Sequence, residues 1–294
     1  MSGPTAARGL FAMAGAAFFL ATGDVSANAS GGALSVVQML MVQSGLWLLL
    51  LLPWAALHAP LARGRHRGWL LLLALANVAF YALYTHALIT IPVAQATVLL
   101  TGGTPFFVLL MVYVLFRLPP SRAEMAWIIV VVAGVGFVLH RGLGVHTLPV
   151  EGMASGAGAA FVLAFTFVAL ARISDESAHA INLWYAALTF FLCLPLFVAS
   201  PRPSQPEPWS WAVLYGLLGL LGQTLLVWCT NDLGPTAGSM VAALVPVIAM
   251  LTAWGLLHGP APGRLECVGA ALVLAGCLGI SREGARRPSL AAVP

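Results

Sequence analysis

The sequence predicts an all-α integral membrane protein whose ten transmembrane helices form two inverted five-helix repeats. Composition is the first observation behind this prediction: 61% of the residues are hydrophobic and 7% are charged, whereas an average soluble domain carries about 25% charge. No water-soluble fold of this length can bury so much apolar surface, so we expect the surroundings to be lipid. The other two observations are a series of apolar runs and an internal repeat.

The apolar runs have the length of membrane spans. A helix needs about 20 residues to cross the hydrocarbon core of a bilayer, and ten runs approach that length. Glycine and proline, which favour turns or remove a backbone donor, separate most of them, as at Pro119-Pro120. The first run also resembles a cleaved signal peptide, but further runs follow at once and we interpret it as a spanning helix. The ten predicted spans are Gly9–Asn28, Leu34–Leu57, Gly68–Leu88, Val93–Phe116, Glu124–His140, Gly152–Ile173, Ala178–Ala199, Trp209–Asp232, Thr236–Leu257 and Leu265–Ser281.

Several landmark residues occur twice in the same order. The four pairs are Thr85 and Thr230, Pro105 and Pro246, Glu124 and Glu266, and Gly134 and Gly276. The last two landmarks are ten residues apart in both copies, whereas the first two are 20 residues apart in one copy and 16 in the other. The hairpin between the first two landmarks therefore needs a deletion. Such a repeat indicates duplication, and in membrane proteins duplicated halves enclose a transport path at their interface.

The placement of arginine sets the expected orientation, because cytoplasmic connections carry more positive charge. All 13 positive residues are arginine, and with ten spans and a cytoplasmic N-terminus only Arg141, Arg202 and Arg264 fall outside. Both termini are therefore expected in the cytoplasm. Five spans per half is an odd number, so the second half enters the membrane with opposite polarity. We expect a first repeat over residues 1–145, an inverted second repeat over 146–282 and a short polar cytoplasmic tail over 283–294.

Each half contains an apolar run with proline, a second apolar run, a short loop, a glutamate and a glycine-rich helix. This unit resembles the EamA type of the drug/metabolite transporter superfamily. The residues that carry the resemblance are Pro105, Glu124, Gly134 and Gly136 in one half and Pro246, Glu266, Gly269 and Gly276 in the other. The resemblance implies a secondary exporter of amino acids or other small metabolites in the bacterial inner membrane, working without ATP. Tyr84-Thr85-His86 is most similar to the aromatic-amino-acid exporter branch.

Asp24 is the only acid in the first apolar run. A charged side chain at bilayer depth costs about 2.5–3.5 kcal/mol on insertion scales. We therefore expect Asp24 to face the interior of the bundle or to lie near the outer surface. Both interpretations stay open: a site for a substrate ammonium group or a proton, and a helix-end charge that reaches outer water.

The third predicted span carries Asn77, Tyr81 and Tyr84 at the spacing i, i+4, i+7, which places them on one helical face. We interpret them as a cavity-lining stripe that binds substrate; an aromatic belt and bonding between helices are the alternatives. His86 lies on another face of the same helix. It is a candidate proton-sensitive gate, with an ordinary interfacial histidine as the alternative.

The eighth predicted span is the repeat partner of the third and carries Gln223 and Trp228. When Thr85 is aligned with Thr230, Gln223 falls beside Asn77. Two amides at equivalent depths of pseudo-symmetric helices predict a shared central substrate site, whereas helix packing is the simpler alternative.

Two further spans contain helix-breaking residues. Gly102, Gly103 and Pro105 stand in the fourth span and Pro246 in the ninth. Proline removes a backbone hydrogen bond, so both helices are expected to be kinked or locally unwound. We interpret these residues as hinges for gating, with a static kink as the alternative.

Motifs of other function classes do not occur in the sequence. There is no HExxH, GxxxxGK[ST], GxSxG or Cys/His metal spacing, so we expect no ATP-driven pump, metal centre or cofactor. The expected partners are a small-molecule substrate and membrane lipid, with no nucleic acid and no obligate protein partner. Rival functions are export of another metabolite or drug, and a lipid-modifying membrane enzyme. That enzyme would need paired acids at one depth, whereas Asp24 and Asp232 are predicted at opposite faces.

Overall fold

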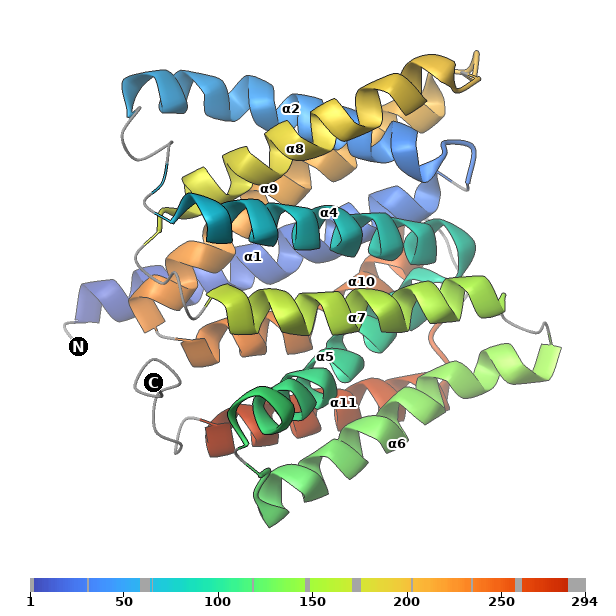
Figure 1. Ribbon diagram of the computed structural model, residues 1–294. Helices are drawn as coiled ribbons and strands as arrows, with labels where there is room; N and C mark the ends of the chain where they lie inside the picture. Colours follow the sequence, from blue (N-terminus) through green and yellow to red (C-terminus); the bar gives the residue numbers. More distant parts are fainter. Residues whose placement is uncertain are drawn as a thin grey trace.

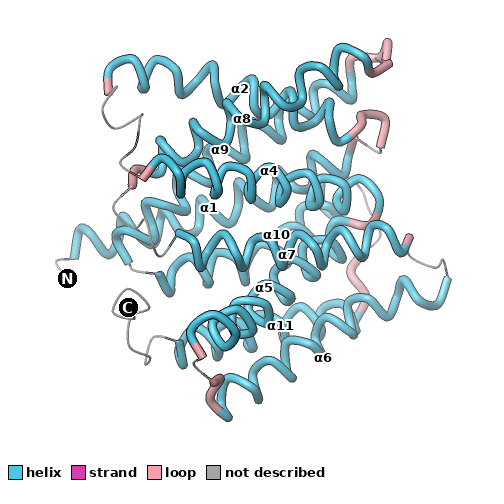
Figure 2. The backbone as a smooth tube through the Cα atoms, viewed as in Figure 1, coloured by secondary structure: helices cyan, strands magenta, loops and turns pink. Residues whose placement is uncertain are grey.

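The computed structural model describes residues 3–30, 32–58, 64, 66–117, 119–145, 149–170, 176–201, 203–233, 235–256 and 261–284. Within these residues the chain forms ten helices and no strand, which confirms the all-α fold class (Figures 1 and 2). The helices are α1 (Gly3–Ala29), α2 (Val36–Leu57), α4 (Arg67–Thr90), α5 (Val93–Phe116), α6 (Arg122–Val145), α7 (Val150–Leu170), α8 (Ala178–Ala199), α9 (Glu207–Leu233), α10 (Pro235–Leu256) and α11 (Arg264–Gly284).

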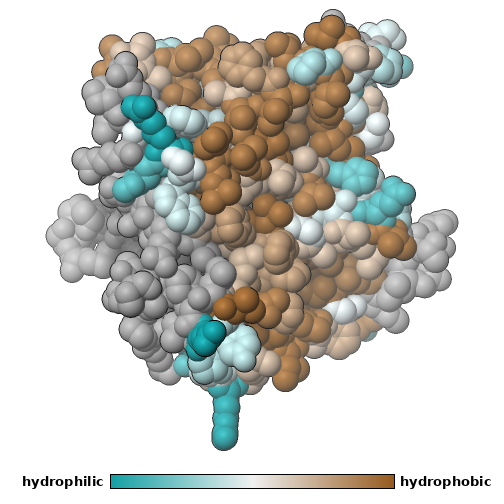
Figure 3. Space-filling view, in the orientation of Figure 1, coloured by the Kyte–Doolittle hydropathy of each residue, from teal (hydrophilic) through white to brown (hydrophobic). Residues whose placement is uncertain are grey.

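The surface of the bundle is that of a multi-pass membrane protein. Seven helices, α2 and α4 to α9, contain a segment long and apolar enough to cross a membrane. Most of the coloured surface in this view is apolar, and hydrophilic groups lie mainly toward the left and right sides, where helices begin and end (Figure 3). Large apolar side chains such as Leu49, Ile129 and Phe191 point outward, as expected where lipid replaces water. Spanning by α1, α10 and α11, and hence the total of ten spans, stays a prediction.

Polar caps begin several helices. Ser35 caps α2, with its hydroxyl accepting from the Gln38 amide and the Gln38 side chain accepting from the Ser35 amide. Glu124 accepts from the Ser121 amide at 2.6 Å before α6, and Glu266 accepts from the Gly263 amide at 2.7 Å before α11. These carboxylates satisfy backbone donors that a helix N-terminus leaves free. Both glutamates therefore have a structural role at the start of their helices.

The packing of the helices repeats itself between the two halves of the chain. Helix α1 packs on α9, and α7 packs on α4; α2 pairs with α8, and α6 pairs with α11. Helices α6 and α11 lie at one end of the bundle and α2 at the other (Figure 1). Helix α1 begins and α11 ends on the same side of the bundle (Figure 1).

Glycine contacts fix the register of this repeat. A Cβ atom added to Gly15 would lie 2.9 Å from Leu225, and one added to Gly158 would lie 3.3 Å from Leu83. Both glycines stand in the sequence Ala-Gly-Ala-Ala-Phe, and Leu225 follows Leu83 by 142 positions. The third and eighth predicted spans are therefore related by 142 positions rather than by the 145 that separate Thr85 from Thr230. The proposed alignment of these two threonines is wrong by three residues, almost one helical turn.

The corrected register changes two details. It pairs Gln223 with Tyr81, and Gly219 instead of Gln223 with Asn77. It also reduces the deletion in the hairpin to one residue, because Pro246 follows Pro105 by 141 positions. The helix bounds agree with this: two residues separate α4 from α5, and one residue separates α9 from α10.

Candidate functional site

Polar and aromatic side chains gather where α1, α2, α4, α8 and α9 meet, in an otherwise apolar bundle. We call this group the central cluster. All its members are buried except Gln223, which is half-buried. The members are Asp24, Gln43, Trp47, Tyr81, Tyr84, Thr85, Tyr185, Tyr215 and Gln223.

Asp24 is the acid of the central cluster. It lies near the C-terminal end of α1, and the hydroxyl of Tyr84 on α4 donates to its Oδ2 atom at 2.7 Å. Beside this pair, the hydroxyls of Thr85 and Tyr215 form a hydrogen bond of 3.3 Å in which either oxygen can be the donor. A buried carboxyl group is tolerated only when it is hydrogen-bonded, so the Tyr84 hydroxyl holds Asp24 in the interior. Asp24 thus faces the inside of the bundle, which is one of the two locations expected from the sequence. Its role as a site for an ammonium group or a proton stays a prediction.

Three aromatic rings form the middle of the cluster. The rings of Tyr81 and Tyr185 stack with centroids 4.8 Å apart and an angle of 29° between their planes. Trp47 packs edge-on against both, at 6.0 Å from Tyr81 and 5.3 Å from Tyr185. The Trp47 Nε1 atom donates to the Gly216 carbonyl of α9 at 2.8 Å. The indole therefore ties α2 to α9 and presents apolar ring surface to the centre.

Two hydrogen bonds in the cluster join residues that the repeat relates to each other. Gln223 donates from Nε2 to the Tyr81 hydroxyl at 3.0 Å, and Tyr185 donates to Gln43 Oε1 at 3.3 Å. Gln223 follows Tyr81 by 142 positions, and Tyr185 follows Gln43 by 142 positions. When equivalent residues of two halves bond to each other, they lie at the line about which the halves are related. The central cluster therefore surrounds this pseudo-two-fold line.

A sequence model of the EamA-like transporter family matches this chain twice, over residues 7–140 and over residues 150–282. The chain belongs to the EamA-like transporter family. This confirms the resemblance drawn from the repeated proline, glutamate and glycine landmarks. The aromatic-amino-acid branch stays a prediction.

Two relatives of this EamA-like transporter, one known by sequence and one by structure, are 24% and 20% identical to it. The pseudopaline exporter CntI of Pseudomonas aeruginosa, from strains UCBPP-PA14 and PAO1, is 24% identical over 208 residues, which are 68% of this chain and 69% of the relative. The crystal structure of another protein superposes on this chain with a TM-score of 0.67 and 20% sequence identity. The superposition covers 95% of this chain and 98% of the other chain. That likeness shows a shared fold.

Four of the predicted site residues of the transporter meet in the central cluster: Asp24, Tyr81, Tyr84 and Gln223. The other predicted substrate residues do not join them in the described contacts. Asn77 and His86 are half-buried on α4, and among the described residues their side chains have no hydrogen-bond partner. Trp228 belongs to α9, but its side chain, like that of Asp232, lies outside the described residues.

Five members of the central cluster are not among the predicted site residues: Gln43, Trp47, Thr85, Tyr185 and Tyr215. The signal that finds two of them is the 142-residue register. Helices α2 and α8 both carry an internal proline, Pro53 and Pro195, 142 positions apart. Superposing the two helices on these prolines pairs Gln43 with Tyr185.

The predicted hinge glycines are close-packing positions in the EamA-like fold. A Cβ atom on Gly102 would lie 2.5 Å from Val135 of α6, and one on Gly103 would lie 2.9 Å from Ala160 of α7. The absent side chains let α5 approach its neighbours, which is a structural reason for both glycines. Their role in gating stays a prediction.

Both predicted hinge prolines lie inside continuous helices, Pro105 in α5 and Pro246 in α10. Pro105 has no N–H to donate to the carbonyl four residues earlier, that of Thr101. The thiol of Cys277 in α11 donates to this carbonyl at 3.7 Å. The proline-released acceptor of α5 is therefore bonded to another helix instead of being open to a ligand.

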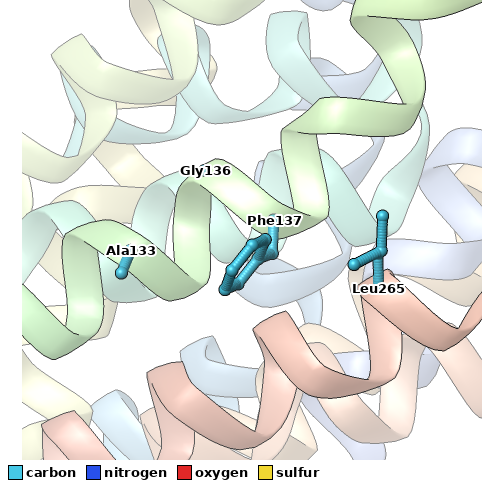
Figure 4. Close-up of a pocket in the computed structure, with 4 residues that line it drawn as sticks. All are labelled: Ala133, Gly136, Phe137 and Leu265. Atoms are coloured by element: carbon cyan, nitrogen blue, oxygen red, sulfur yellow. The ribbon is translucent and has the colours of Figure 1, made fainter.

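A surface depression lies away from the central cluster. It is lined by Ala133, Gly136 and Phe137 of α6 and by Leu265 of α11 (Figure 4). Its lining is mainly apolar and carries no charged side chain. On the outside of a membrane protein such a depression suits a lipid chain, and it has no chemistry for a polar substrate.

Proposed function

We propose that this EamA-like transporter is a secondary exporter of amino acids, aromatic and other neutral ones, with broad specificity, in the bacterial inner membrane. The observation that carries the proposal is the buried Asp24–Tyr84 pair beside the stacked rings of Tyr81 and Tyr185. An intramembrane acid is expensive and marks a functional site by default. Aromatic walls with a few placed polar groups are the usual lining of a small-molecule site.

Each part of an amino acid has a counterpart in the central cluster. The ammonium group would pair with Asp24, whose Tyr84 partner keeps the carboxylate oriented. The substrate side chain would pack on Trp47, Tyr81 and Tyr185, whose rings accept aliphatic and aromatic groups alike. Such contacts discriminate weakly between apolar side chains of different size, which supports broad specificity.

The proposed mechanism is alternating access by two inverted five-helix halves. The paired contacts of α1 with α9 and of α7 with α4 support it, as does the location of the cluster on the pseudo-two-fold line. The N-terminus of α1 and the C-terminus of α11 share one side of the bundle (Figure 1). The excess of arginine in the connections on that side supports a cytoplasmic location for both termini.

The principal alternative is export of another small metabolite. One observation favours it: the curated relative CntI is named as a pseudopaline exporter, at 24% identity. Export of a larger molecule would use the same cluster for part of the substrate only.

Counterflow in proteoliposomes tests the proposal. Vesicles containing the purified transporter are loaded with unlabelled phenylalanine, leucine, glutamate or arginine, and uptake of the labelled compound is measured with and without a pH gradient. We expect exchange of phenylalanine and leucine. Exchange that survives collapse of the gradient indicates facilitated diffusion, whereas accumulation driven by the gradient indicates proton coupling. If no amino acid exchanges, the amino-acid proposal is wrong, and exchange of a nucleoside or a cationic drug would then identify another substrate class.

A further inference from the structure

The side-chain amide of Gln43 is the one amide of the central cluster that is fully buried, with 0% of its surface exposed. Its Oε1 atom accepts from the Tyr185 hydroxyl at 3.3 Å. Its Nε2 atom has no hydrogen-bond partner among the described residues. A buried donor without an acceptor is costly, so native proteins seldom keep one unless a water, an ion or a ligand completes it.

Gly219 of α9 leaves a space about the size of one carbon atom beside this donor. A Cβ atom on Gly219 would lie 3.6 Å from Gln43 Nε2 and 3.5 Å from Trp47 Cζ2. No side chain therefore stands between the amide and the backbone of α9 at this point. The repeat equivalent of Gly219 is Asn77, 142 positions earlier, so the fold accommodates a side chain at the related position. The open position at Gly219 is specific to the half that faces Gln43.

Two groups of the central cluster have a proton to donate, Gln43 Nε2 and the Tyr81 hydroxyl. Tyr81 accepts from Gln223 and keeps its own hydroxyl proton for another acceptor. No Arg, Lys or His is among the buried side chains of the described residues, so the donors at the cluster are neutral. Asp24 is the carboxyl group of the cluster, and it bonds to Tyr84, which is three residues after Tyr81 on α4. A ligand that meets both ends therefore needs an acceptor at Gln43 and a cation at Asp24.

We propose that Gln43 Nε2, together with the Tyr81 hydroxyl, binds a carboxylate oxygen of the substrate, while the ammonium group of the same molecule meets Asp24. This inference rests on the proposed function and makes it more specific: the substrates are amino-carboxylates, and Gln43 determines that class. Amines that lack the carboxylate leave the Gln43 donor unpaired, and a site built to bond a group rejects analogues without it.

The test compares phenylalanine with phenethylamine, which lacks only the carboxylate, in counterflow by folded protein. We expect the wild type to prefer phenylalanine at least tenfold. In Gln43→Leu the preference falls about tenfold through loss of phenylalanine transport. In Gln43→Glu, which keeps the size of the side chain but offers a negative charge in place of the donor, the preference falls further. Gln38→Leu is the matched control: its amide donates to the Pro201 carbonyl, and the preference should not change.

Thermal stability separates a binding role from a structural one. If Gln43 serves the ligand, Gln43→Leu removes an unsatisfied donor together with the acceptor of the Tyr185 hydroxyl. Its loss of Tm should then be smaller than that of Gln38→Leu, which removes satisfied contacts with Ser35 and Pro201. An unchanged preference in a folded Gln43→Leu protein overturns the inference. Equal transport of both compounds by the wild type also overturns it and leaves the proposed function standing. Transport of neither compound overturns both.

Discussion

The Asp24–Tyr84 pair of the central cluster differs in chemistry and in exposure from the two positions that the repeat relates to it. On one side, Asp24 of α1 bonds to Tyr84 of α4. The Ala-Gly-Ala-Ala-Phe match places Phe167 of α7 at the position of Asp24, and the 142-residue register places Leu226 of α9 at that of Tyr84. Asp24 is 7% exposed, whereas Phe167 is 43% exposed. The duplicated scaffold therefore carries an acid at one of these two related positions only, and the acid is at the less exposed one.

The exposure of Phe167 is a departure from the repeat and not a general property of its helix. Phe18 and Phe161 are equivalent residues on the outer faces of α1 and α7, and they are 50% and 47% exposed. The exposed fractions of the equivalent outward residues thus agree, whereas those of Asp24 and Phe167 differ. In the transport cycle that we propose, this difference corresponds to a state closed at the Asp24–Tyr84 side and open at the Phe167 side.

Removing the charge of Asp24 is expected to give the largest effect. Asp24→Asn keeps the size of the side chain and an acceptor for Tyr84 but cannot pair with an ammonium group. Hydrogen bonds to charged groups contribute about 1.5–3 kcal/mol, so counterflow of phenylalanine should fall roughly ten- to hundredfold. The control is Phe18→Leu, on the outer face of the same helix, which should retain transport. If Asp24→Asn transports phenylalanine at the wild-type rate, the substrate ammonium group does not depend on Asp24, and the difference between the two related positions has no functional meaning.

Labelling by a water-soluble maleimide sharpens the comparison of exposure. In a background without the four native cysteines, we expect Phe167→Cys to react at least tenfold faster than Phe161→Cys in vesicles. Both positions are exposed, but in the proposed state the first faces a water-filled opening and the second faces lipid, where the reagent is excluded. Equal slow reaction at both positions would mean that Phe167 also faces lipid, and the proposed open side would be wrong.

The sequence predicts the helices better than it predicts the site, and the reason is geometric. The bounds of a helix are set by residues that are close together in the sequence, namely the apolar run and its flanking glycines and prolines. The bounds of α2, α4, α5 and α8 therefore agree with the expected spans within one or two residues. The central cluster depends on which helices meet. The spacing of Tyr81 and Tyr84 indicates one face of α4, and the lone acid in the first run indicates Asp24. Gln43 has no such local signal.

Asn77 shows the limit of the periodicity argument. It shares the spacing of Tyr81 and Tyr84 but is only half-buried and has no hydrogen bond among the described residues. A helical face extends along the whole helix, whereas the cluster occupies only the part of α4 that meets α1, α8 and α9. The three-residue error at Thr85 and Thr230 has a related cause, because a shift of nearly one turn preserves the apolar pattern while it changes every contact.

Away from the cluster the two halves are alike, and substitutions there should have equal, smaller effects. A Cβ atom on Gly134 of α6 would lie 2.7 Å from the Gly269 carbonyl, and one on its equivalent Gly276 of α11 would lie 3.1 Å from the Trp127 carbonyl. Overpacking of this kind costs about 1–3 kcal/mol, so Gly134→Ala and Gly276→Ala should each lower Tm by a few degrees. Gly136, beside the depression in Figure 4, has nothing within 4 Å of an added Cβ.

Gly136→Ala is therefore the matched control on the same helix, and its Tm should stay at the wild-type value. All three variants should keep the preference for phenylalanine over phenethylamine, because none of the three glycines belongs to the central cluster. A fall in Tm confined to Gly134→Ala would mean that α6 and α11 contribute unequally to their interface. The two halves of the chain would then differ outside the central cluster as well as within it.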